Sequence, residues 1–347
     1  MKSFAYAHAA APGWRDCVDA CAERIGRPGA GLGFVYFTDA LVDHAQDVVE
    51  ILRSRTGVAD WVGTVGIGVL ATGAEYQEEP ALAVMVADVE QFRIFSGRSP
   101  LKTFESNFAV VHADPSAPDV AGLVSDLSSR IASGYIVGGL SSSRTRTVQV
   151  ANDVLSGGLS GVALGAEVGV ATRLTQGCWP LPGRFRVTAC EQNIIATLDG
   201  RPALDVLRET VGSERIEILV GLAVAGSDTG DFMARNLVGI DPRHKLIAIG
   251  DLVEPGAELM FCRRDGEAAR KDLARIAGEL RRQVRAPRGA LYFSCTARGE
   301  HMFGSRGAEL DLVGQALGEV PLVGFFCNGE ISHDRVYGYT GVLTVFH

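Results

Sequence analysis

The sequence has little lysine and no run of basic residues. Its 347 residues carry a formal net charge of −8, and lysine occurs only at Lys2, Lys102, Lys245 and Lys271. The other basic residues are arginines, and they form no stripe interleaved with aromatic side chains. Because proteins bind nucleic acids largely by neutralising phosphates, nucleic acid is not expected as a partner.

Long apolar stretches and paired cysteines are also missing. No uninterrupted apolar run reaches the roughly 18 residues that a membrane-spanning helix needs, and residues 1–14 lack the apolar region of a signal peptide. The seven cysteines are an odd number and include no CxxC pair. We therefore expect no membrane span, reduced thiols and a cytoplasmic location.

The common catalytic and cofactor-binding motifs are absent. The sequence contains no GxxxxGK[ST] phosphate loop, no HExxH zinc motif and no GxSxG nucleophile elbow. The glycine-rich segment 63–73 lacks the GxGxxG spacing of a dinucleotide-binding turn. The seven histidines do not cluster in sequence, so no spacing predicts a metal site.

The sequence does contain a core-forming composition and an internal echo. Hydrophobic residues make up 47% of the chain, and apolar strands alternate with helical patterns, which predicts an α/β protein with mixed sheets. Residues 33–68 and 289–330 both read as strand, helix, strand, and in both the second strand begins with Val-Gly. The length and this strand–helix–strand echo predict two related domains.

Polar groups gather at the predicted strand ends. Gly138, Gly139 and Ser141 follow one strand, where backbone N–H groups can form an anion-binding nest. A solvated loop is an equally good interpretation of these residues. Arg235 and Asn236 lie in an apolar strand, where a guanidinium needs a partner.

An internal carboxylate is favoured as the partner of Arg235, with Asp241, Asp265 and Glu330 as candidates. A ligand carboxylate is the alternative, since the guanidinium fork suits one.

Two further strands end in a thiol. Cys295 precedes Arg298, whose charge can lower a thiol pKa, and Cys327 precedes Asn328 and Glu330. If the echo makes these strands neighbours, the groups converge at one sheet edge, where α/β sheets bind ligands. The candidate ligand-binding residues are Gly138, Gly139, Ser141, Arg235, Asn236, Cys295, Arg298, Cys327, Asn328 and Glu330.

Four stretches of the sequence resemble the FIST family. TQGCWPLPGRFRVTACEQNIIATLDGRPALDVL (175–207) resembles the Q-G-C-x-P…L-D-G-x-P-A-L signature of FIST proteins. YFSCTARG (292–299) and GFFCNGEI (324–331) are similar to the FIST C-terminal domain, and residues 60–89 are similar to the N-terminal domain. The resemblance implies an N-terminal domain over residues 1–200 and a C-terminal domain over residues 201–347.

The resemblance also implies a function. It implies that this chain is an intracellular sensory module. Such a module would bind a small ligand such as an amino acid and signal through a histidine kinase or another separate partner. One branch of the family binds haem and senses nitric oxide, which makes haem the alternative ligand; it would need an axial His or Cys. A cysteine-dependent enzyme is the third hypothesis, with Cys295 or Cys327 as nucleophile and Glu330 or His301 as base.

Overall fold

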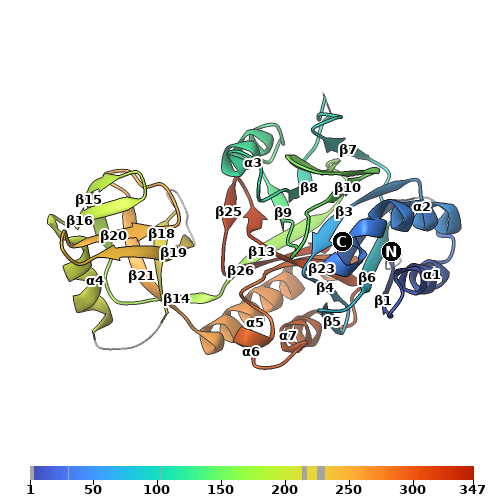
Figure 1. The fold of residues 1–347 in the computed structure, drawn as a ribbon. Coiled ribbons are helices and arrows are strands. Elements are labelled where there is room, and N and C mark those ends of the chain that lie inside the picture. The colour runs from blue at the N-terminus through green and yellow to red at the C-terminus, as the bar shows by residue number, and fades with distance from the viewer. Residues whose placement is uncertain (1–3, 30, 103, 213–216, 225–230) are drawn as a thin grey trace. The chain divides into compact units, whose positions relative to one another are not determined.

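The computed structural model describes residues 4–29, 31–102, 104–212, 217–224 and 231–347, which fold into two compact units. Unit 1 contains residues 1–175 and 270–347, and unit 2 contains residues 176–269. Accordingly, the blue and red ends of the chain lie in one body in Figure 1, and the yellow and light orange segments form the other. The predicted α/β class with mixed sheets is confirmed.

Unit 1 repeats one strand order three times. Repeat I (residues 5–87) has β1 (Ala5–Ala10), α1 (Trp14–Ile25), β2 (Leu32–Thr38), η1 (Asp39–His44), α2 (Ala45–Thr56), β3 (Asp60–Gly66), β4 (Gly68–Ala71), β5 (Ala74–Gln77) and β6 (Ala81–Ala87). Repeat II (92–164) has β7 (Phe92–Ser96), β8 (Phe108–Ala113), α3 (Val120–Ser129), β9 (Ile136–Leu140), β10 (Gln149–Ala151), β11 (Asp153–Leu155) and β12 (Leu159–Leu164). Repeat III (170–346) has β13 (Val170–Gln176), α5 (Gly266–Gln283), β22 (Gly289–Cys295), α6 (Glu300–Phe303), α7 (Ala308–Leu317), β23 (Leu322–Cys327), β24 (Glu330–Ser332), β25 (Arg335–Tyr337) and β26 (Thr340–Phe346).

Each repeat sends a hairpin into the sheet of another repeat. The three six-stranded sheets run β1-β6-β2-β3-β10-β11, β7-β12-β8-β9-β24-β25 and β13-β26-β22-β23-β4-β5. In each sheet a parallel pair, β2/β3, β8/β9 or β22/β23, is flanked by antiparallel strands. Hairpin β4–β5 leaves repeat I for the sheet of repeat III, β24–β25 leaves repeat III for repeat II, and β10–β11 leaves repeat II for repeat I. The exchange is cyclic, so each repeat depends on another to complete its sheet.

The three parallel pairs share one close backbone contact. In the second strand of each pair a glycine lies against a carbonyl oxygen of the first strand, with no room for a side chain. An ideal Cβ would lie 1.7 Å from the Val35 oxygen at Gly63, 1.8 Å from Val111 at Gly138 and 1.7 Å from Tyr292 at Gly324. The Val-Gly echo at 62–63 and 323–324 is therefore confirmed, and residues 137–138 are a third copy that the sequence analysis missed.

The inner faces of the three sheets form the central core of unit 1. In the first strand of each parallel pair, the residue paired with the close-contact glycine is followed by a residue with a ring. These residues are Tyr36, His112 and Phe293, and they therefore occupy equivalent positions in the three repeats. Their ring centroids lie 5.5, 6.2 and 6.4 Å apart, and all three pairs are edge-to-face. Burial lowers the pKa of His112 to about 3, so this imidazole is neutral.

Helices cover the outer faces. In repeat I, α1 buries Cys17, Val18 and Cys21 from one stripe and packs with α2 against the sheet. Helix α2 ends at Gly57, whose left-handed conformation (φ +75°) lets its N–H bond the carbonyl of Arg53. In repeat III, α5 holds the same place in the strand order as α1.

Unit 2 is a small closed barrel, and its residues are inserted in the sequence of repeat III, from the end of β13 to the start of α5. Its strands run β21-β15-β16-β20-β19-β18 and back to β21, so the sheet closes on itself. Helix α4 buries its apolar stripe in the core of the barrel. The elements are β14 (Cys178–Pro180), β15 (Phe185–Glu191), β16 (Ile194–Leu198), β17 (Arg201–Pro202), α4 (Ala203–Val211), β18 (Ile218–Ala223), β19 (Phe232–Asp241), β20 (Leu246–Ile249) and β21 (Glu258–Arg264).

The close contact in the third pair gives a direct test. Gly324→Ala places a methyl group 1.7 Å from the Tyr292 oxygen, and the free energy of unfolding should fall by at least about 2 kcal/mol in urea denaturation. Gly314→Ala is the control, because Gly314 is exposed in α7 with no atom near its added Cβ. That variant should gain up to about 1 kcal/mol. Equal stability of the two variants would contradict the proposed role of the contact.

Candidate functional site

Eight of the ten candidate residues meet in unit 1. Cys295 and Cys327 are paired in register at the ends of β22 and β23, as the echo predicts. Glu330 pairs with Gly139, and the Asn328 N–H donates to the carbonyl of Leu140. Gly138, Ser141 and Arg298 complete the set, which lies where β9 and β23 end.

The other two candidates lie in unit 2. Arg235 and Asn236 are on β19, and Arg235 Nε donates to Asp251 Oδ2 at 2.6 Å. The expected internal carboxylate is therefore present, but it is none of the three acids that the sequence analysis named. Asp251 is in reach because it follows β20, the antiparallel neighbour of β19.

The strand-end residues are buried and bonded to one another. Cys295, Arg298, Cys327 and Glu330 are 7%, 1%, 0% and 0% exposed. Cys295 Sγ accepts the N–H of Tyr339, just before β26 begins. The equivalent residues of the other repeats, Thr38 and Asp114, accept the N–H groups of Ala81, the first residue of β6, and of Gly157, which precedes β12. Cys295 therefore accepts a hydrogen bond at a position that accepts one in each repeat.

Gly139 and Ser141 also have packing roles. A Cβ on Gly139 would lie 2.2 Å from the sulfur of Cys327, so glycine leaves the space that this thiol fills. Ser141 Oγ lies 2.7 Å from Thr64 Oγ1 and donates to the carbonyl of Ala113. Ligand binding by these residues stays a prediction, and the bonds described here connect the repeats.

Arg298 pairs with an acid that the sequence analysis missed. Its Nε donates to Glu309 Oε1 at 2.8 Å, and Nη2 lies 2.8 Å from the same oxygen. Tyr292 and Ser294 donate to the same carboxylate, so the pair is hydrogen-bonded as well as buried. The available signal was the position of Glu309 beside Leu310 on the apolar stripe of α7, where an acid needs a partner.

Glu330 is the second buried acid of this cluster. Its Oε2 accepts the N–H and the hydroxyl of Thr340. Burial raises the pKa of Glu330 to about 8, although the hydrogen bonds from Thr340 oppose the rise. The carboxyl is therefore protonated near neutral pH.

This raised pKa predicts a pH dependence of stability. The folded chain holds the Glu330 proton up to about pH 8, and the unfolded chain releases it near the ordinary value of 4.5. The folded state binds more protons between these values, so its stability should fall as pH rises from about 4.5 to about 8. In Glu330→Gln the amide can still accept from Thr340, and urea denaturation across this range should show a smaller fall. An unchanged slope would contradict the assignment.

The thiols are protonated as well as buried. Burial raises the pKa of Cys295 to about 12, with the nearby Glu330 adding to the rise, and burial also raises the pKa of Cys327. A cysteine nucleophile acts as the thiolate. The arrangement therefore opposes the use of either sulfur as a nucleophile.

Alkylation tests the state of these thiols. Cys190 is half-buried, whereas the other six cysteines are buried. Iodoacetamide on the native protein should label Cys190 first, and Cys295 and Cys327 should react only in denaturant, as read by peptide mass spectrometry. Cys190→Ser is the control that should lose the native label. Rapid labelling of Cys295 or Cys327 in the native protein would instead support the hypothesis of a cysteine-dependent enzyme.

The cavities lie elsewhere, in repeat II. Between the outer strand and the first parallel strand, repeats I and III carry a helix, but residues 97–102 and 104–107 form none. Three cavities adjoin this segment, with volumes of about 380, 490 and 210 Å³. All three are lined by Arg130, which ends α3.

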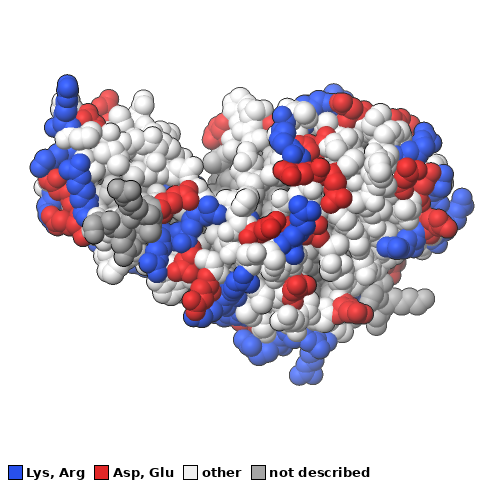
Figure 2. Space-filling model, turned by 60° about the horizontal axis from the view of Figure 1, so that its bottom comes forward, with Lys and Arg blue, Asp and Glu red and all other residues white. Residues whose placement is uncertain are grey.

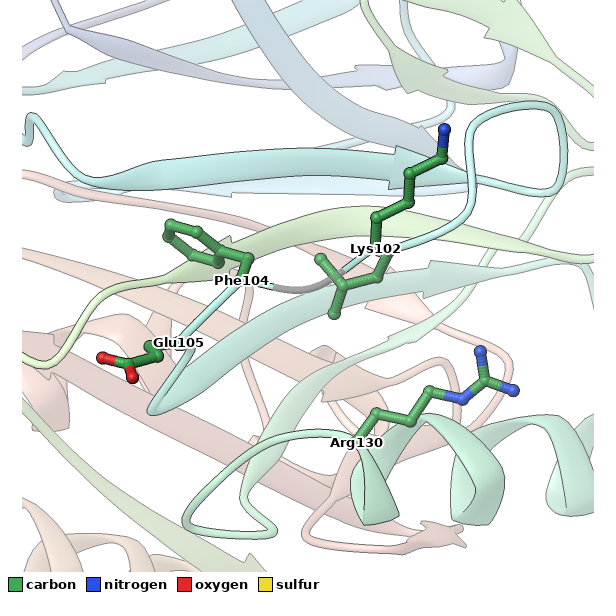
Figure 3. Close-up of a pocket in the computed structure, with 5 residues that line it drawn as sticks. Lys102, Phe104, Glu105 and Arg130 are labelled. Carbon is green, nitrogen blue, oxygen red and sulfur yellow. The ribbon is translucent and has the colours of Figure 1, made fainter.

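The first cavity is drawn in Figure 3. The amino group of Lys102 and the guanidinium of Arg130 extend to the same side of the view, and the carboxylate of Glu105 extends to the opposite side. Phe104 lies on the side of Glu105. The cavity is therefore lined by two cationic groups, an anionic group and an aromatic ring.

The described lining of these three cavities includes neither of the residue types that would ligate a haem iron here. None of the three is lined by a histidine or a cysteine. Among the described residues no three His, Cys, Asp or Glu side chains gather as metal ligands. Figure 2 shows acidic and basic side chains intermixed over the face it draws. No helix in the described part of the chain has the length and apolar character to cross a membrane.

The chain belongs to the FIST family. Residues 31–201 match the FIST N domain and residues 203–333 match the FIST C domain. The chain is 33% identical over 340 residues to Uncharacterized protein Rv0628c of Mycobacterium tuberculosis, with 88% of each chain covered. It is 31% identical over 352 residues to Uncharacterized protein Mb0898c of Mycobacterium bovis, again with 88% of each covered. FIST domains are associated with small-ligand sensing in signalling proteins.

The two family segments do not coincide with the two compact units. Unit 1 takes residues from the FIST N segment and from the FIST C segment, and so does unit 2. The boundary between the segments falls in unit 2, between β17 and α4. Each unit therefore contains residues of both segments.

Proposed function

We propose that this protein is a sensory protein that binds a small metabolite, such as an amino acid, at the repeat II cavities and signals through a separate partner. The observation that carries the proposal is the segment between β7 and β8, where residues 97–102 and 104–107 form no helix although repeats I and III have one at this position. At the equivalent position in repeat I, α1 packs its apolar stripe on the sheet. In repeat II the outer face is packed by α3 and by Leu101 and Phe104.

Size and lining also support this site. The largest of the three cavities, about 490 Å³, falls in the range of small-molecule pockets. Its lining combines charged and hydroxyl side chains with Phe104 and Ile131. The strand-end cluster supports ligand binding less well, because its side chains are buried and line none of the three cavities.

Ligand-induced stabilisation tests the proposal. A panel of the 20 amino acids, each added to the purified chain, should contain at least one that raises the melting temperature without being consumed. A ligand at about 100 times its Kd stabilises by about 2.7 kcal/mol. Ala132→Trp should abolish the shift, since Ala132 lines the largest cavity.

Ala121→Trp is the matched control on the same segment. Ala121 is exposed on α3 and lines none of the three cavities, so this variant should keep the shift. A panel without any shift, or full binding by Ala132→Trp, would overturn the proposed site.

A further inference from the structure

We infer that the repeat II cavities select a small monocarboxylate with one apolar side group, which Arg130 holds by its carboxylate. This inference rests on the proposed function and names the ligand class for the same site. Arg130 lines all three cavities: the apolar cavity of about 210 Å³, the polar cavity of about 490 Å³ and the cavity of Figure 3. A ligand bound at this junction can extend into both.

The apolar side of the site is the cavity of about 210 Å³. Phe95, Leu101, Leu123, Leu127 and Leu159 line it, and they come from β7, the segment after it, α3 and the start of β12. An apolar cavity of about 150 Å³ accommodates benzene. The recess is therefore large enough for a phenyl ring or a branched aliphatic group, which its leucines would remove from water.

The polar side contains a buried hydroxyl without a partner. Ser106 is 1% exposed, lines the cavity of about 490 Å³, and its Oγ has no hydrogen-bond partner among the described residues. Leaving a buried polar group unpaired costs on the order of 1–3 kcal/mol. A ligand oxygen or amine that bonds this hydroxyl removes that cost, so Ser106 points to a polar ligand group next to Arg130.

Arg130 has donors available for an anion. Among the described residues its guanidinium donates one hydrogen bond, from Nη2 to Asp126 Oδ2 at 2.6 Å, and its side chain is 53% exposed. A guanidinium carries five N–H donors and binds carboxylates through two parallel hydrogen bonds. These donors favour a ligand carboxylate at Arg130.

Isothermal titration calorimetry on the full chain tests the inference with four probes. L-phenylalanine carries all the groups, 3-phenylpropanoate lacks the amine, phenethylamine lacks the carboxylate, and L-aspartate lacks the apolar group. The two phenyl carboxylates should bind at least 10-fold more tightly than phenethylamine and L-aspartate. L-phenylalanine and 3-phenylpropanoate should bind with similar affinity, because they share the carboxylate and the phenyl group, and failure of both to bind more tightly than phenethylamine would overturn the inference.

Two variants separate the carboxylate contact from the apolar contact. Arg130→Met keeps an unbranched stem without the charge and should weaken L-phenylalanine binding at least 10-fold while leaving phenethylamine binding unchanged. Arg130 is exposed and its pair with Asp126 adds little to stability, so the variant should fold. Leu123→Ser places a polar group in the lining of the apolar cavity, so this variant should bind L-phenylalanine and 3-phenylpropanoate more weakly.

The outcomes keep this inference distinct from the proposed function. If another small molecule binds and Ala132→Trp blocks it, but neither phenyl carboxylate binds, the inferred class is overturned and the proposed site stands. If Arg130→Met binds L-phenylalanine as tightly as the natural chain, the carboxylate assignment is overturned. If no small molecule binds at these cavities, the proposed function fails together with the inference.

Discussion

The structure of unit 1 depends on the cyclic exchange of hairpins among its three repeats. The inner hydrogen-bonding edges of β3, β9 and β23 are paired by strands from another repeat, which removes them from solvent. The close contact at Gly63, Gly138 and Gly324 brings the two strands of each parallel pair together, and the inner faces then meet around three aromatic rings. In each repeat the last neighbouring hairpin of the sheet comes from another repeat, and the core combines residues from both ends of the chain.

This exchange explains why the polar strand ends do not form an open site. In an open parallel sheet the carboxyl ends of the strands face a crevice. Here the chain leaves each parallel pair to join another sheet, and its polar groups serve as caps at the crossing. At the ends of the first parallel strands, Thr38, Asp114 and Cys295 accept the N–H groups of Ala81, Gly157 and Tyr339. These acceptors are a hydroxyl, a carboxylate and a thiol, so equivalent positions share a hydrogen-bonding role although their side chains differ.

The sequence predicted the elements and part of the cluster, but not the exchange. The Val-Gly echo and the apolar strands placed Cys295 beside Cys327 because parallel pairing is recorded in the local pattern. The pairing of β4 with β23 joins segments more than 250 residues apart, and no local pattern encodes it. Glu309 was overlooked because a single acid in a helix reads as solvated unless the buried face is followed through Leu310 and Val313. The repeat II cavities were missed because they follow from a helix that one repeat lacks.

The departure from the repeat pattern is therefore more informative about function than the pattern itself. Buried hydrogen bonds and close glycine contacts recur in all three repeats, which is what stability requires of each sheet. A ligand site needs accessible volume and side chains that the core does not use. Repeat II supplies both where residues 97–102 and 104–107 stand in place of a helix, since its apolar side chains meet a half-exposed guanidinium and an unpaired buried hydroxyl. A repeated fold can keep two copies for stability and modify the third for binding.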